Sequence, residues 1–84
     1  MYSISFKKSA QKELFSIPKP YNQNIAQAID RLAENPRPEG VKKLKGDYNA
    51  YRIRVGDYRV IYTIEDIIKI VEIQRIPHRK DAYK

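Results

Sequence analysis

The sequence from residue 51 to residue 62 is Tyr51-Arg52-Ile53-Arg54-Val55-Gly56-Asp57-Tyr58-Arg59-Val60-Ile61-Tyr62. Apolar and basic side chains alternate on both sides of Gly56-Asp57, a dipeptide typical of the two-residue turns that close β-hairpins. Such a turn pairs Arg54 directly with Arg59 and brings Arg52 to the same face of the hairpin. Because like charges in a cross-strand pair destabilise a sheet, we expect an anion to bind between these arginines.

The net charge supports the same expectation. The chain has 84 residues, with 17 Lys and Arg against 10 Asp and Glu, which give a net charge of +7 and a pI near 9.7. Most of the excess lies in residues 41–84. Such an imbalance is expected of a nucleic-acid-binding protein, although basic side chains also serve simply to solubilise a surface.

Length and composition predict one small domain spanning residues 1–84, with a thin core. The absence of cysteine excludes disulfides, a thiolate nucleophile and a cysteine zinc site, and it fits a reducing cytoplasm. The first residues lack the apolar run of a signal peptide, and no run of eighteen apolar residues occurs. We therefore expect a soluble cytoplasmic protein with no membrane segment.

Hydrophobic spacing predicts an α+β fold. Apolar residues alternate in Tyr2–Phe6, which indicates a strand, and Ser9 is expected to cap a short helix that ends at Pro18 and Pro20. Helical spacing predicts a second helix over Tyr21–Glu34. Three further strands are expected in a meander, at 51–55, 58–64 and 67–74, the last two joined at Glu65-Asp66. The prediction is a small antiparallel sheet, made of the N-terminal strand and the meander, packed against an αα-hairpin.

The expected meander has two different faces. Continued pairing places Arg59 opposite Glu72, Ile61 opposite Ile70 and Thr63 opposite Ile68, all on the face of Arg52 and Arg54. The other face is apolar and should pack on the helices; it carries Tyr51, Ile53, Val55, Val60, Tyr62, Ile64, Val71 and Ile73. In this register Lys69 lies on the apolar face and must extend from a sheet edge to reach water.

The face of the sheet that carries Arg52 and Arg54 is expected to stay uncovered by the helices, and we call it the open face. Its residues and those of the C-terminal tail suit one reaction, cleavage of an RNA phosphodiester by the neighbouring 2′-hydroxyl. That reaction needs positive charge on the phosphorane, which Arg52, Arg54, Arg59 and the tail residue Arg79 can supply. Arginine stays protonated, so the proton carriers must be other groups. His78 is the only histidine, and Tyr83 has a pKa that several adjacent cations would lower. Glu72 is a further candidate acceptor.

Each of these residues also has a plainer interpretation. His78 near a terminus is often exposed and idle, Tyr83 can simply anchor the tail, and the arginine face can be a surface paired with acids such as Glu72. Lys42, Lys43, Lys45 and Lys80 are expected to contact phosphates, although the first three also fit a solvated loop. No sequence motif suggests a metal or a nucleotide cofactor, so the predicted chemistry uses neither.

The order of these segments resembles a known family. The strand, the two helices, Lys43-Leu44-Lys45-Gly46, the run from Tyr51 to Tyr62, and the tail His78-Arg79-Lys80-Asp81-Ala82-Tyr83 are similar to the RelE toxins of the RelE/ParE superfamily. The resemblance covers essentially the whole chain. It implies a toxin of a type II toxin-antitoxin system: a small basic endoribonuclease that cuts mRNA in the ribosomal A site and is neutralised by a cognate antitoxin.

The resemblance also implies roles for individual residues. Arg52 and Arg54 correspond to the basic pair of the first hairpin strand, Arg59 to the phosphate-stabilising arginine, and Arg79 and Tyr83 to the tail arginine and tyrosine. This chain has arginines where the best-known member has lysines on that strand, and its spacing from Arg79 to Tyr83 is shorter. His78 matches a histidine of related toxins. Two alternatives remain on the same scaffold, a ParE-like inhibitor of DNA gyrase that is not an enzyme, and an inactive relative that only binds RNA or its antitoxin.

Overall fold

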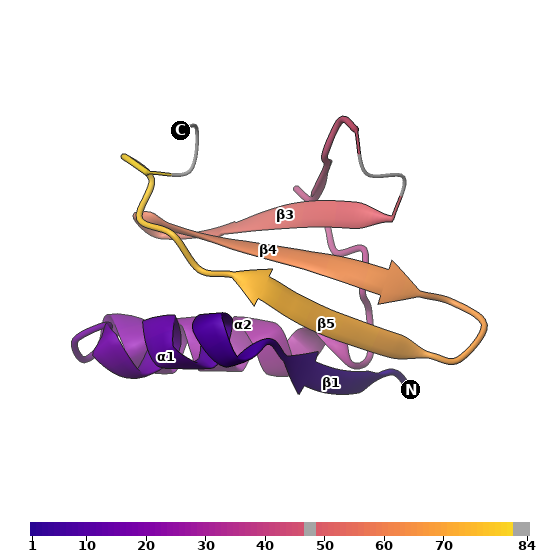
Figure 1. Cartoon of the computed structure of the whole chain (residues 1–84), viewed down its shortest axis with the longest axis horizontal. Helices are drawn as coiled ribbons and strands as arrows, with labels where there is room; N and C mark the ends of the chain where they lie inside the picture. Colours follow the sequence, from indigo (N-terminus) through magenta and orange to yellow (C-terminus); the bar gives the residue numbers. More distant parts are fainter. Residues whose placement is uncertain (47–48, 82–84) are drawn as a thin grey trace.

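The computed structural model describes residues 1–46 and 49–81. Within them lie the helices α1 (Lys8–Ser16) and α2 (Tyr21–Leu32) and the strands β1 (Ser3–Phe6), β2 (Lys42–Lys43), β3 (Ala50–Val55), β4 (Tyr58–Glu65) and β5 (Ile70–Arg75). The strands form one sheet in the order β1-β5-β4-β3-β2, and both helices lie on one face of it (Figure 1). This confirms the predicted α+β architecture. Neither described helix is long and apolar enough to cross a membrane.

The sheet is mixed, whereas the sequence predicted an antiparallel one. β1 runs parallel to its neighbour β5, with Ser3 opposite Ile70 and Phe6 opposite Ile73. The N–H of Ser3 donates to the carbonyl oxygen of Lys69 at 2.8 Å, which anchors the start of β1 at the turn that precedes β5. Both strands therefore begin at the same end of the sheet and run in the same direction.

A fifth strand lies where a basic loop was expected. Residues Lys42 and Lys43 form β2, which pairs antiparallel with β3 and places Lys42 opposite Arg52 and Lys43 opposite Tyr51. Because neighbouring strand residues point to opposite faces, Lys42 joins the face of Arg52 while Lys43 does not.

The first helix begins before the predicted cap. Its N-cap is Lys7, which makes no side-chain capping bond, and Ser9 already lies in the first turn. The N–H of Lys7 donates to the carbonyl of Ile73 at 3.0 Å, and the carbonyl of Lys7 accepts from Gln11. The chain thus passes directly from pairing with β5 into the helix. The start of α1 is therefore set by the hydrogen bond between Lys7 and Ile73, and not by a serine cap.

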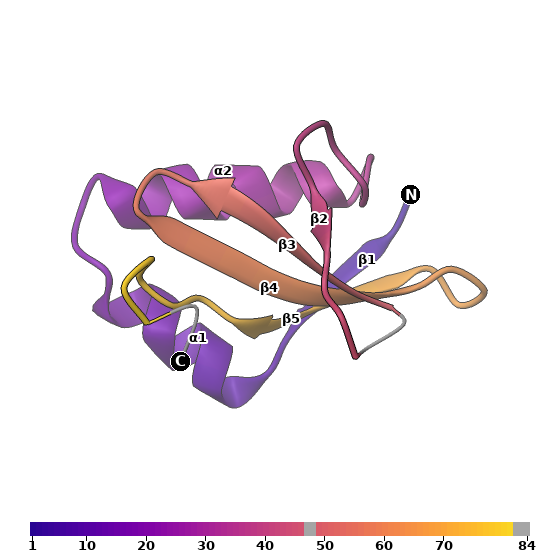
Figure 2. The same cartoon turned by 90° about the horizontal axis from the view of Figure 1, so that it is seen from above.

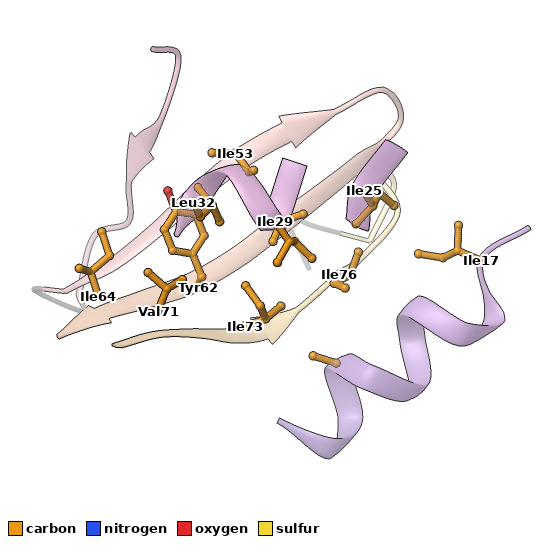
Figure 3. Close-up of a cluster of buried hydrophobic side chains, with 12 residues drawn as sticks. Ile17, Ile25, Ile29, Leu32, Ile53, Tyr62, Ile64, Val71, Ile73 and Ile76 are labelled. Atoms are coloured by element: carbon orange, nitrogen blue, oxygen red, sulfur yellow. The ribbon is translucent and has the colours of Figure 1, made fainter. Parts of the chain in front are cut away.

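The core lies between the sheet and the helices. Ile25, Ile29 and Leu32 of α2 are buried, and they meet the apolar face of the sheet (Figure 3). Every residue predicted for that face is buried in the core or packed against it: Tyr51, Ile53, Val55, Val60, Tyr62, Ile64, Val71 and Ile73. The prediction of which strand residues face the helices is confirmed, and the opposite face of β3 and β4 is left without a helix over it (Figure 2).

The turn between β4 and β5 is longer than predicted. It spans residues 66–69, so β5 begins at Ile70, and Lys69 lies in the turn with φ of +59°. Lys69 is therefore not on the apolar face; its Nζ lies 4.9 Å from the ring centroid of Tyr2. Ile67, which was assigned to the strand because it is apolar, is 97% exposed at the tip of the turn.

The longer turn changes the register of the last strand. Glu72 pairs with Thr63, and Ile61 pairs with Arg75 beside a bulge at Ile61/Tyr62. The predicted pairings of Arg59 with Glu72, Ile61 with Ile70 and Thr63 with Ile68 were wrong. Glu72 remains on the open face, but its carboxylate accepts a hydrogen bond from Gln74 Nε2 at 2.8 Å.

A polar cluster holds this turn in place. The two terminal nitrogens of Arg37 each donate to a different oxygen of the Asp66 carboxylate, at 3.2 and 2.9 Å, and the Tyr2 hydroxyl donates to the same carboxylate at 2.6 Å. Arg37 Nε also donates to the Tyr51 hydroxyl at 3.2 Å. These bonds join the residue before β1, the loop after α2, β3 and the β4–β5 turn, so four separate segments meet at one carboxylate and one guanidinium.

We predict that the Asp66 cluster makes stability depend on pH in the acid range. The hydrogen bonds from Arg37, and then that from Tyr2, lower the pKa of Asp66 to about 2. Ionised Asp66 therefore stabilises the folded state at pH values above its unfolded-state pKa of about 3.9. This stabilisation is lost as the pH falls from about 3.9 towards the folded-state pKa of about 2. Denaturant unfolding between pH 5 and pH 2, roughly the window of these two pKa values, should show a steeper decline for the wild type than for Asp66→Asn. Parallel pH profiles for the two proteins would contradict the assignment.

We also predict that the Tyr62 hydroxyl stabilises the fold. Tyr62 is fully buried, and its hydroxyl donates to the carbonyl oxygen of Pro36 at 2.7 Å. Tyr62→Phe leaves that carbonyl without its donor, which should lower the free energy of unfolding by about 1–3 kcal/mol in a denaturant titration. The matched control is Tyr51→Phe, whose hydroxyl bond to Arg37 is exposed and should matter less. Equal losses in the two variants would refute this explanation.

Candidate functional site

The hairpin of β3 and β4 forms as the sequence predicted. Arg54 is paired directly with Arg59, and Arg52 with Ile61. Gly56 has a φ of +59°, and Asp57 lies outside the left-handed region, which is the pattern of a type II′ turn. A two-residue turn of this type sets the register of both strands, so local chemistry alone brings the two guanidinium groups together.

Four cations surround one hollow on the open face. This arginine hollow has a volume of about 210 Å³ and is lined by Gly40, Lys42, Arg52, Arg54 and Arg59. No acidic side chain is among these lining residues. Lys42 reaches the hollow because β2 pairs with β3, a contact that the sequence analysis did not foresee.

Backbone carbonyl groups hold the two paired arginines. Arg59 is 8% exposed, and its Nη1 donates to the carbonyl oxygens of Tyr58 at 3.0 Å and Gly56 at 3.2 Å. Arg54 Nε donates to the same Gly56 oxygen at 3.4 Å. Across residues 1–46 and 49–81, neither Arg54 nor Arg59 forms an ion pair with a carboxylate. Arg54 and Arg59 therefore keep their charge in the hollow, and neither is paired with Glu72, whose carboxylate accepts from Gln74.

The C-terminal tail folds back on the start of β4. The N–H of Arg59 donates to the carbonyl of Pro77 at 3.0 Å, and His78 forms a bridge with Tyr58. The N–H of Arg79 donates to the carbonyl of Asp57 at 2.6 Å, and its Nε lies 3.7 Å from the Asp57 carboxylate. Arg79 is thereby held next to the hairpin turn.

His78 does not join the arginine hollow. Its ring lies edge-on to the Tyr58 ring, with centroids 5.4 Å apart. Tyr58 packs against the core on the helix side of β4, whereas Arg59, the next residue, points to the open face. The His78 ring is therefore on the helix side of the strand. Its Nδ1 accepts a hydrogen bond from the N–H of Lys80 at 3.2 Å, so a neutral His78 carries its proton on Nε2.

The other predicted site residues are more dispersed. Lys43 and Lys45 are exposed but do not line the hollow, and Lys80 is exposed in the tail. Tyr83 lies outside the described residues. Within the described part of the chain, no group of three or more histidine or acidic side chains is placed to hold a metal ion.

Comparison with known proteins identifies the family. A family model described as "ParE toxin of type II toxin-antitoxin system, parDE" matches residues 4–83. The chain belongs to the RelE/ParE family of toxins. Toxin RelE3 of Methanocaldococcus jannaschii is 33% identical to it over 84 residues, which cover 95% of this chain and 93% of the relative. Toxin RelG of Mycobacterium tuberculosis is 30% identical over 87 residues, covering 99% and 97% of the two chains.

Solved structures agree with this assignment. The toxin superposes on a chain of the archaeal RelE-RelB complex from Pyrococcus horikoshii OT3 with a TM-score of 0.84 and 34% identity, covering 96% of this chain and 98% of that one. The protein is thus a RelE-like toxin of the type II toxin-antitoxin class. Its helices lie over one face of the sheet (Figure 2), and the arginines that line the hollow point to the other face.

We predict that inorganic phosphate binds in the arginine hollow and stabilises the toxin. Phosphate should raise the melting temperature above that in chloride of equal ionic strength, because an anion relieves repulsion among the lining cations. Arg54→Gln should remove most of this increment and, without phosphate at low salt, raise the free energy of unfolding by about 0.2–1 kcal/mol. Lys12→Gln, which removes an exposed cation of α1, is the matched control and should leave the phosphate response intact. A response equally reduced by both changes would mean that phosphate acts through net charge alone.

Proposed function

We propose that this toxin is a ribosome-dependent mRNA endonuclease that cleaves RNA without a metal and so stops translation in the cytoplasm. The observation that carries the proposal is the arginine hollow, in which Arg54 and Arg59 face each other with no carboxylate partner in the described residues. A folded protein gains nothing from this repulsion, whereas an RNA phosphate would relieve it.

The chemistry of the proposed reaction needs no cofactor. The 2′-hydroxyl of one nucleotide loses its proton and attacks the adjacent phosphorus, the bond from phosphorus to the 5′-oxygen breaks, and that oxygen takes up a proton. The products are a 2′,3′-cyclic phosphate and a 5′-hydroxyl. Negative charge accumulates on the phosphorane oxygens, and this is where fixed donors are most effective.

In the proposal Arg59 is the main stabiliser of that charge. Two backbone carbonyls hold its guanidinium in a nearly buried position, so little reorganisation is needed when the phosphorane forms. The neighbouring phosphate oxygens are bound by Arg52, Arg54 and Lys42, and Arg79 approaches from the tail.

The exposed lysines outside the hollow have a different role in the proposal. They attract RNA over a longer range through their charge, and they are Lys43, Lys45 and Lys80.

His78 and Tyr83 are the proposed proton carriers. His78 lies on the helix side of β4, so it reaches a phosphate in the hollow only through a change in the tail, whereas Tyr83 follows Arg79 by four residues. His78→Gln and Tyr83→Phe therefore test which of the two residues carries a proton in the reaction. The residue whose substitution abolishes cleavage but leaves RNA binding intact is the proton carrier.

Neutralisation by a cognate antitoxin is part of the proposal. The structural relative from Pyrococcus horikoshii is a RelE-RelB complex. In this chain a second hollow of about 360 Å³ lies between α2 and β3 and shares Gly40 and Arg54 with the arginine hollow; its wall includes the apolar Leu32, Ile53 and Val55. A partner seated there would contact Arg54 and so compete with RNA.

We predict that Arg59→Ala and Arg79→Ala relieve growth arrest without unfolding the toxin. Loss of one fixed donor to a developing oxyanion typically lowers the rate about 10²–10³-fold. Primer extension on mRNA from translating ribosomes should show cuts within A-site codons for the wild type and for the control Lys12→Gln, and strongly reduced cuts for Arg59→Ala and Arg79→Ala. Full toxicity of both variants would refute the assigned site.

The second candidate function is inhibition of DNA gyrase without catalysis, and the match to a family model named for ParE favours it. Intact message together with accumulated gyrase–DNA cleavage complexes would select this function. RNA binding with neither effect would identify the toxin as an inactive relative.

A further inference from the structure

Three aromatic rings form a row at one end of the molecule. The ring centroids of Tyr21 and Tyr58 are 6.2 Å apart with an interplanar angle of 41°, and those of Tyr58 and His78 are 5.4 Å apart at 81°. The rings come from the start of α2, the start of β4 and the tail, which are remote in sequence. In Figures 1 and 2 all three segments lie at the end of the fold that holds the β3–β4 turn.

This row differs from the aromatic pair inside the protein. Tyr62 stacks on Tyr51 with its hydroxyl bonded to a buried carbonyl, so that pair has a structural task. Tyr21 is 52% exposed, and within the described residues its hydroxyl makes no hydrogen bond. A large ring that is half exposed and whose hydroxyl is unbonded within the described residues is available to bind a ligand.

The surroundings of the row favour a nucleic acid as that ligand. Lys19 precedes Tyr21 by two residues, and Arg79 and Lys80 directly follow His78; all three are exposed. Two acidic residues lie in the same region. Asp57 is paired with Arg79 at 3.7 Å, and a pair so long and exposed is readily exchanged for a phosphate, while Asp81 follows Lys80 and donates its N–H to the carbonyl of His78 at 2.8 Å. Aromatic rings beside exposed cations are the arrangement with which proteins bind single strands.

We propose that Tyr21, Tyr58 and His78 form a stacking site for bases of single-stranded RNA that lie beyond the phosphate held in the arginine hollow. The inference rests on the proposed RNA chemistry and adds a second contact region on the helix side of β4. The strand passes from the hollow around the β3–β4 turn, where Arg79 contacts a phosphate, and a base then stacks on the exposed face of Tyr21. Stacking of this kind tolerates any base, because every base has a π-face.

The site is tested by binding a fluorescein-labelled 2′-O-methyl oligoadenylate, which the proposed chemistry cannot cleave, to the intact toxin over a range of salt concentrations. Tyr21→Ala should weaken binding about tenfold and leave the slope of log affinity against log salt unchanged, since the ring carries no charge. Arg59→Ala should weaken binding and also reduce that slope by about one. Tyr21→Trp should bind as tightly as the wild type or more tightly.

The chain offers a matched control in Phe15, which is 78% exposed on α1 and has no ring partner among the described residues. Phe15→Ala should bind like the wild type. Tyr21→Leu preserves much of the buried volume without the ring, so weak binding by a stably folded Tyr21→Leu separates stacking from folding. Wild-type affinity in Tyr21→Ala and Tyr21→Leu, equal losses in Tyr21→Ala and Phe15→Ala, or no binding by the wild type would each overturn the stacking site. If the Tyr21 variants bind the oligonucleotide weakly as expected but the wild type makes no cuts in mRNA on ribosomes, the proposed nuclease activity is rejected and the stacking site is retained.

Discussion

The carbonyl oxygen of Gly56 accepts hydrogen bonds from Arg54 and Arg59, the two arginines that its own turn brings face to face. A carbonyl oxygen carries only a partial negative charge, so it can orient a guanidinium without neutralising it. The turn therefore creates a charge repulsion and, in the same step, fixes its geometry. The arginine hollow, the position of the tail and the proposed chemistry all depend on this one hairpin.

The fold uses arginine in two contrasting ways. Arg37 is paired through two nitrogens with the Asp66 carboxylate, and that ion pair ties together segments far apart in the chain. Arg59 is more buried than Arg37 yet has only carbonyl partners in the described residues. A buried cation without a carboxylate is costly in a protein that has nothing to bind. The contrast indicates a structural role for Arg37 and supports the proposal that Arg59 binds an anion.

The packing of the helices decides which side of the sheet is available for the proposed binding of RNA. α2 presents Ile25, Ile29 and Leu32 to the apolar face, and this burial leaves the basic face of β3 and β4 open. The tail then adds a second basic and aromatic region at the end of the sheet, joined to the hairpin turn through Asp57. In the proposed binding mode a single RNA strand contacts both regions in succession, which lets a small domain bind an extended strand.

The sequence by itself determined the features that depend on neighbours in the chain. Alternation separated the apolar face from the basic face, and Gly56-Asp57 paired Arg54 with Arg59, because a two-residue turn leaves one register available. The tertiary structure alone decided the parallel pairing of β1, the recruitment of Lys42 through β2, and the side of β4 on which His78 lies. Each of these depends on a contact between distant segments.

The β4–β5 turn shows the physical reason most clearly. Ile67 and Ile68 have the composition of a strand, yet they lie in the turn because Asp66 is bonded to Tyr2 and Arg37, and the carbonyl of Lys69 accepts from Ser3. No local pattern contains those partners, so the register of Glu72 could not be obtained from the sequence. Local hydrogen bonding and alternation set the hairpin that carries the charge, whereas long-range bonds, made only once the chain has folded, set what surrounds it.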